Sequence, residues 1–165
     1  MRSHRQIALV AAGLVIIAAG AVGAQDSGWG SGYQMGQSYA GVSNIDKTRL
    51  TFSCAGRNAR VDPGKGGPSL TVAMPKAKAM QAQARSVEIV VDDKATRVPV
   101  RAEHDNDMLA FVWTPGSSFG TASMRPVVAA LRKAKTIEVR AAGATLVFSA
   151  QSADEALKDD PLTCD

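Results

Sequence analysis

Apolar and polar positions alternate along much of the chain, and this pattern predicts a series of short β-strands. Leu50, Phe52 and Cys54 alternate with more polar neighbours, which is the period of a half-buried strand. Strand-like apolar segments recur at residues 69–74, 87–91, 96–100, 109–113, 137–139 and 146–148. Pro99 lacks a backbone N–H, so we expect its strand to lie at a sheet edge or to carry a bulge.

One segment, residues 122–134, has clear helical periodicity. Its apolar positions follow the spacing i, i+3, i+4 and i+7 of a core-facing stripe, and they are Met124, Val127, Val128 and Leu131. A short helix is expected after Ser152, with Ala153, Ala156 and Leu157 turned inward. Strands in hairpin order with few helices between them indicate an α+β fold. We therefore expect a mostly antiparallel, sandwich-like sheet of about seven strands, one packed helix and a short C-terminal helix.

The first residues have the pattern of a secretory signal peptide. Arg2 and Arg5 precede an uncharged apolar segment over residues 7–24, which ends in small side chains, and a polar stretch follows. The alternative is an uncleaved anchor, but the apolar segment barely reaches the ~20 residues that span a bilayer. We expect residues 1–24 to be cleaved after export, which would leave a periplasmic or secreted protein that is not integral to the membrane.

Residues 25–44 are rich in Gly, Ser and Gln and show neither helical nor strand periodicity. This composition predicts a flexible arm, with Trp29, Tyr33 and Tyr39 as possible anchors onto the domain. Residues 45–165 are expected to form a single globular domain.

Charge and composition argue against some classes of partner. The chain carries 19 Lys and Arg against 15 Asp and Glu, and removal of Arg2 and Arg5 would lower its net charge of +4 to +2. Aromatic residues make up only 5% of the chain, too few for a base-stacking platform. We therefore expect no nucleic-acid binding.

Cys54 and Cys164 are the only cysteines. In an oxidising compartment an even number of cysteines predicts a disulfide, here one that ties the first core strand to the C-terminal end. The alternative is a pair of buried free thiols.

The segment from Gly116 to Gly120 matches the pattern G-x-S-x-G between an expected strand and an expected helix, which is the context of a nucleophile elbow. Such hydrolases place their histidine after the serine, but no histidine follows Ser118, and His104 lies upstream. A serine without a base is a poor nucleophile, so we expect no catalytic residues and interpret 115–120 as a loop.

Glu103, His104, Asp105 and Asp107 gather oxygen and nitrogen donors within five residues. The spacing does not match a calcium loop, and one histidine with two paired cysteines does not make a zinc site. We therefore interpret 103–107 as a solvated turn and expect no metal and no cofactor. The glycine-rich loop 56–67 likewise lacks the spacing of a phosphate-binding loop.

The C-terminal part combines the expected helix over 123–134, the strand over 136–140 and the run Val147-Phe148-Ser149, which leads to Cys164. Together with the early strand Leu50-Thr51-Phe52-Ser53-Cys54, this arrangement resembles exported proteobacterial proteins of the invasion-associated-locus-B type. The resemblance implies a periplasmic β-rich domain with a binding role and no catalytic site to carry over.

The sequence thus favours a non-enzymatic exported domain that binds a protein or envelope partner. One alternative is a small inhibitor of a hydrolase, which would present loop 115–120 or loop 56–67. A second alternative is an esterase that uses Ser118. An enzyme would show polar groups converging around Ser118, an inhibitor would show a protruding loop, and a binding domain would expose a contiguous apolar or aromatic patch.

Overall fold

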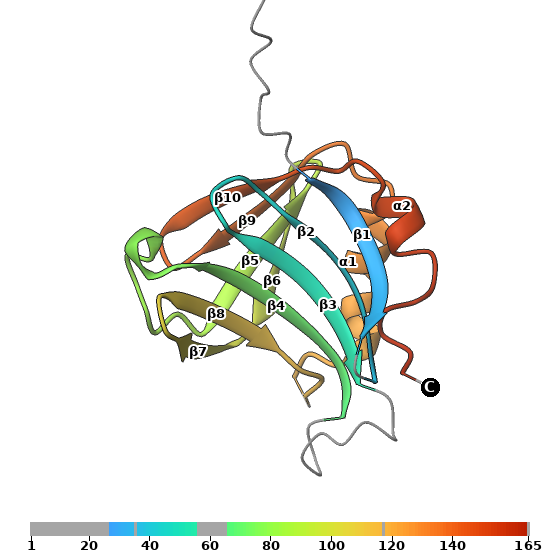
Figure 1. Cartoon of the computed structure of the whole chain (residues 1–165), viewed down its shortest axis with the longest axis horizontal. Coiled ribbons are helices and arrows are strands. Elements are labelled where there is room, and N and C mark those ends of the chain that lie inside the picture. Colours follow the sequence, from blue (N-terminus) through green and yellow to red (C-terminus); the bar gives the residue numbers. More distant parts are fainter. Residues whose placement is uncertain (1–26, 35, 56–65, 117, 165) are drawn as a thin grey trace, which may run out of the picture.

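Ten strands form two antiparallel sheets in the part of the chain that the computed structural model describes, which is residues 27–34, 36–55, 66–116 and 118–164. The larger sheet has the spatial order β1-β2-β3-β4-β8-β7 and the smaller sheet the order β10-β9-β5-β6 (Figure 1). The larger sheet consists of β1 (Ser27–Gln34), β2 (Gln37–Ser43), β3 (Arg49–Ala55), β4 (Gly67–Pro75), β7 (Arg101–Asp105) and β8 (Met108–Trp113). The smaller sheet consists of β5 (Ser86–Val91), β6 (Lys94–Pro99), β9 (Ile137–Ala141) and β10 (Ala144–Phe148).

Helices are few and short in the described residues. They are α1 (Thr121–Leu131), α2 (Ala153–Ala156) and the 3-10 turn η1 (Lys76–Lys78). The expected antiparallel β-rich class with one packed helix and a short C-terminal helix is therefore confirmed. The expected strand count and single sandwich-like sheet are wrong, because the described residues form ten strands in two sheets.

The two sheets and α1 share one hydrophobic core. Phe52, Leu70 and Phe111 are fully buried on β3, β4 and β8, where the sheet register brings Phe52 opposite Leu70. Ile89 and Val139 face them from paired positions of the smaller sheet. The predicted helical stripe is confirmed, since the buried residues of α1 are Met124, Val127, Val128 and Leu131. Pro99 ends β6 at the edge of its sheet, as its missing N–H requires.

The expected flexible arm is wrong for most of residues 25–44, because β1 and β2 form there and pair with β3. β1 and β2 therefore belong to the larger sheet, so the expected boundary at residue 45 does not separate them from the domain. Glycine permits close packing that conceals the strand pattern: a Cβ added to Gly41 would lie 2.8 Å from the Leu50 carbonyl oxygen on β3. Trp29 is a buried anchor with 5% exposure, whereas Tyr33 and Tyr39 are 76% and 43% exposed.

The expected solvated turn over 103–107 is also wrong in part, because residues 101–105 form β7. The turn is confined to Asn106 and Asp107, and Asn106 adopts a positive φ of 41°. A polar sequence suits β7 because it is an edge strand, and an edge strand is blunted against aggregation by charges.

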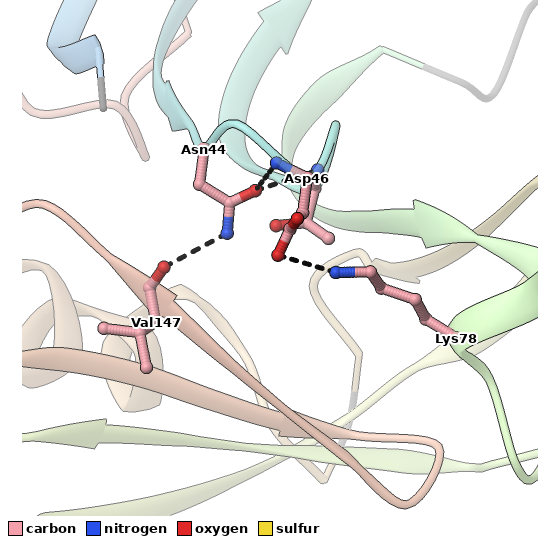
Figure 2. Close-up of polar contacts among 5 residues, drawn as sticks. Asn44, Asp46, Lys78 and Val147 are labelled. Carbon is pink, nitrogen blue, oxygen red and sulfur yellow. Dashed lines mark hydrogen bonds and ion pairs between the residues drawn. The ribbon is translucent and has the colours of Figure 1, made fainter. Parts of the chain in front are cut away.

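The turn between β2 and β3 joins the two sheets (Figure 2). The Asn44 carboxamide oxygen accepts hydrogen bonds from the backbone N–H groups of Asp46 and Thr48 at 3.1 and 3.2 Å. Its Nδ2 donates to the Val147 carbonyl on edge strand β10 at 3.2 Å, and Asp46 forms a 2.7 Å ion pair with Lys78. The turn therefore covers part of the β10 edge.

Candidate functional site

A groove of about 550 Å³ runs between β1 and the C-terminal segment that follows α2. Figure 1 shows α2 beside β1, with the chain after α2 looping away and then returning toward the ends of β1 and β3. The strand wall includes Ser31, Tyr33 and Ser38. The opposite wall includes Asp159, Asp160, Pro161 and Thr163, and both cysteines line the groove.

The first half of β1 is fixed by the chain between β10 and α2. Trp29 donates its backbone N–H to the Gln151 carbonyl at 2.8 Å and its indole N–H to the Ser149 carbonyl at 2.9 Å. A Cβ added to Gly28 would lie 3.0 Å from the Gln151 carbonyl oxygen, so this position favours glycine. Up to Trp29, therefore, β1 has a partner on its outer side.

Beyond Trp29 the outer edge of β1 is open. The N–H and C=O groups of successive strand residues point to alternate sides, so Ser31 and Tyr33 face the same way as Trp29. The hairpin agrees, because Gln34 and Gln37 flank a two-residue connection and so occupy a position where the two strands exchange hydrogen bonds. Among the described residues, none pairs with the outward backbone groups of Ser31 and Tyr33.

The other sheet edges are protected in ways that β1 is not. The β10 edge is capped by Asn44, β6 ends in Pro99, and β7 is short and carries the Arg101–Glu103 ion pair. Proline, charged side chains, short strands and covering loops are the usual means of blunting an edge. The sequence of β1, SGWGSGYQ, contains no charge and no proline. Its open edge is therefore suited to pair with another strand.

The Cys54–Cys164 disulfide closes the end of the groove. The two Cα atoms lie 5.4 Å apart, so the predicted pairing is confirmed. Leu157 and Leu162, which precede Cys164, are buried in the core and hold the C-terminal segment against it. This wall is therefore fixed both by a covalent bond and by packing.

The acidic side chains of the groove have different roles. Asp160 accepts hydrogen bonds from the Leu162 N–H at 3.0 Å and the Thr163 hydroxyl at 3.2 Å, and Arg125 lies 3.7 Å away. Asp159 is exposed and forms no ion pair with a described residue. The neighbouring Lys158 donates a hydrogen bond to the Glu155 carboxylate, and this bond, followed by the negative charges of Glu155 and Asp159, raises the pKa of the lysine. Asp159 thus leaves a negative charge available on the groove wall.

The residues singled out for catalysis lie apart. His104 is an exposed residue of β7 opposite Leu109, near one end of β8, and Ser118 follows the other end of that strand. The run from Leu109 to Trp113 alone spans roughly 13 Å at ~3.3 Å per residue. Among the described residues Ser118 forms no hydrogen bond, and its loop is held instead by Trp113, whose indole donates to the Phe119 carbonyl at 3.0 Å.

Within the described residues, no three His, Cys, Asp or Glu side chains come together as a metal site. Glu103 is paired with Arg101 rather than grouped with His104. Of loop 56–67, residues 56–65 lie outside the described residues, as does the expected signal peptide over 1–24. None of the described helices is both long and apolar enough to cross a bilayer.

Sequence reasoning identified Tyr33 only as a possible anchor and did not connect it with Asp159. The signal available was the disulfide, which predicted that the C-terminal end lies near the start of the sheet. Nothing in the local pattern indicated that residues 27–34 form the strand beside it.

The fold and groove define a small, disulfide-linked, two-sheet domain with one open strand edge. The chain matches the YfjT family model over residues 27–157, and it therefore belongs to the YfjT family. No curated protein and no solved structure matches the chain. The match begins at β1, which agrees with the inclusion of β1 and β2 in the domain.

Proposed function

We propose that this protein is an exported, non-enzymatic domain that binds a protein partner in the periplasm or outside the cell through the groove beside β1. The open edge at Ser31 and Tyr33 carries the proposal, because unpaired strand edges in natural proteins are normally protected unless they pair with something. The groove beside this edge is large enough to hold several side chains of a bound segment.

Export is supported by the signal-like segment over residues 1–24 and by the disulfide, which persists in oxidising compartments. A binding role is supported by Tyr33, a residue of the groove wall that is 76% exposed. Aromatic side chains with an apolar body and a polar tip are common at binding surfaces. The resemblance to the invasion-associated-locus-B type points to the same kind of role.

A pull-down with matched groove and loop variants tests the proposal. The exported protein serves as bait in an envelope extract, in wild-type form and as Ser38→Trp and Ser118→Trp. Ser38 is an exposed residue that lines the groove, so a tryptophan there fills the space, whereas Ser118 lies on the exposed loop after β8.

The proposal predicts that wild type and Ser118→Trp retain the same partner and that Ser38→Trp loses it. Loss in Ser118→Trp alone would contradict the proposal and favour the inhibitor alternative, because the loop would then be the contact surface. Turnover of ester substrates that disappears in Ser118→Ala would overturn the non-enzymatic assignment.

A further inference from the structure

The ligand of this groove follows from its backbone and its charge. We infer that it is an extended peptide segment carrying a lysine or arginine, which adds to the larger sheet as a new strand beside β1. This inference rests on the proposed function, since it names the chemistry of the partner at the same groove.

The backbone geometry favours an added strand over a folded surface. Ser31 and Tyr33 each direct one N–H and one C=O outward, and the two positions are separated by about 6.6 Å along the strand. An extended peptide repeats the same period, so alternate residues of the peptide meet these four groups in register. Main-chain pairing of this kind supplies affinity without requiring a particular peptide sequence.

The wall opposite β1 supplies a preference for positive charge. Asp159 has no described ion-pair partner, whereas Asp160 forms an ion pair with Arg125 at 3.7 Å and accepts hydrogen bonds from Leu162 and Thr163. A lysine or arginine side chain can lay its aliphatic stem along the exposed Tyr33 side chain and direct its charge toward the Asp159 carboxylate. The groove therefore distinguishes a basic segment from an acidic one.

Steric considerations favour a single segment over a second copy of this chain. In each copy the Gln151 region covers the β1 edge at Trp29, and the C-terminal segment lies beside the rest of the strand. Direct pairing of two β1 edges would bring these covering segments together, along with Asp159 from both copies. A short peptide carries neither the covering segments nor a second Asp159, so it can approach the edge of β1 directly.

The test is a selection of phage-displayed random 12-residue peptides on the exported, oxidised protein. The affinity of a fluorescently labelled selected peptide is then measured by polarisation. The inference predicts enrichment of peptides with alternating side-chain character and at least one lysine or arginine. Sedimentation of the free protein at the same concentrations should give a monomer, whereas a dimer lost in Ser31→Pro would overturn the assignment of the groove to a peptide.

Ser31→Pro and Ser31→Ala form the matched pair. Proline removes an outward N–H that bonds nothing within the described fold, and proline is tolerated at such edge positions. We expect Ser31→Pro to weaken peptide binding by about tenfold or more and Ser31→Ala to change it by less than about twofold. A peptide N-methylated at its pairing residues should be weakened equally on the unaltered protein, which keeps the test valid if Ser31→Pro folds poorly.

Asp159→Asn tests the charge separately. It should weaken a lysine-bearing peptide by about three- to fivefold at low salt and leave a glutamine-substituted peptide unaffected. If the selected peptide binds Ser31→Pro and Ser31→Ala equally well, and its N-methylated form binds the unaltered protein as tightly as the original, strand addition is overturned. No enrichment of basic peptides would overturn the charge preference. If either result is obtained but Ser38→Trp loses the partner in the pull-down, the proposed function stands and only this inference fails.

Discussion

Removal of the Cys54–Cys164 disulfide should be the most destabilising change that leaves the core intact. The perturbation is the double variant Cys54→Ala/Cys164→Ala. The bond joins residues 110 positions apart, so it encloses most of the folded domain and strongly restricts the unfolded chain. Chain-entropy arithmetic for a loop of this length gives roughly 4–5 kcal/mol of stabilisation.

The structure indicates that the stability lost comes mainly from the greater conformational freedom of the unfolded chain. The chain contains no other cysteine, and Leu157 and Leu162 are buried in the core, so we expect them to keep packing there when the bond is removed. The double variant should therefore fold, with a lower free energy of unfolding and a melting temperature lower by roughly 10–20 °C.

Urea unfolding followed by tryptophan fluorescence measures the effect, since Trp29 and Trp113 are both buried and report on the larger sheet. Wild type in reducing buffer is the control, and it should match the double variant. A difference in the free energy of unfolding below about 1 kcal/mol between the oxidised wild type and the variant would contradict this prediction, because the bond would then impose little restraint on the unfolded chain.

Three further outcomes follow from packing and charge. Gly41→Ala should destabilise the domain by about 1–3 kcal/mol, because its Cβ would lie 2.8 Å from a backbone oxygen of β3. Gly30→Ala is the control and should be nearly neutral, since nothing lies within 4 Å of its added Cβ. The urea midpoints of the two variants measure the difference. Leu131→Ala, fully buried on α1, should cost about 2–5 kcal/mol in the same assay. Hydrogen bonds from the backbone N–H groups of Thr136 and Lys135 lower the pKa of Asp92. The Asp92 carboxylate therefore stabilises the fold above roughly pH 4, and this contribution is lost as the pH falls through the lowered pKa. Asp92→Ala should reduce the difference between the urea midpoints at pH 7 and pH 3.

The elements that sequence predicted well are those with a strong apolar period. Leu50 and Phe52 on β3, like the stripe of α1, bury large side chains at regular spacing, and no other local structure accommodates that pattern. The disulfide was predictable because a chain with two cysteines has only one possible internal pairing.

The missed strands lack that period for physical reasons. In β1 and β2 several positions that pack against neighbours are glycine or alanine, such as Gly32, where the Tyr39 ring occupies the space of a Cβ. β7 is an edge strand with polar side chains, and its pairing with β8 is a tertiary property.

The groove could not be predicted for a further reason. Tyr33 and Asp159 are more than a hundred residues apart in the chain, and their proximity depends on the path of the C-terminal segment after α2. An unpaired strand edge also has no sequence signature of its own. It is defined by which neighbours a strand lacks once the sheet order is fixed.

Amide hydrogen exchange, measured by NMR with and without the partner retained in the pull-down, shows whether that partner pairs with the open edge of β1. In the free protein the N–H of Trp29, which bonds Gln151, should exchange slowly, whereas those of Ser31 and Tyr33 should exchange rapidly. We expect the partner to protect the N–H groups of Ser31 and Tyr33 selectively and to leave the exchange of the Trp29 N–H unchanged. Partner binding that leaves the exchange of both Ser31 and Tyr33 unaltered would contradict this expectation.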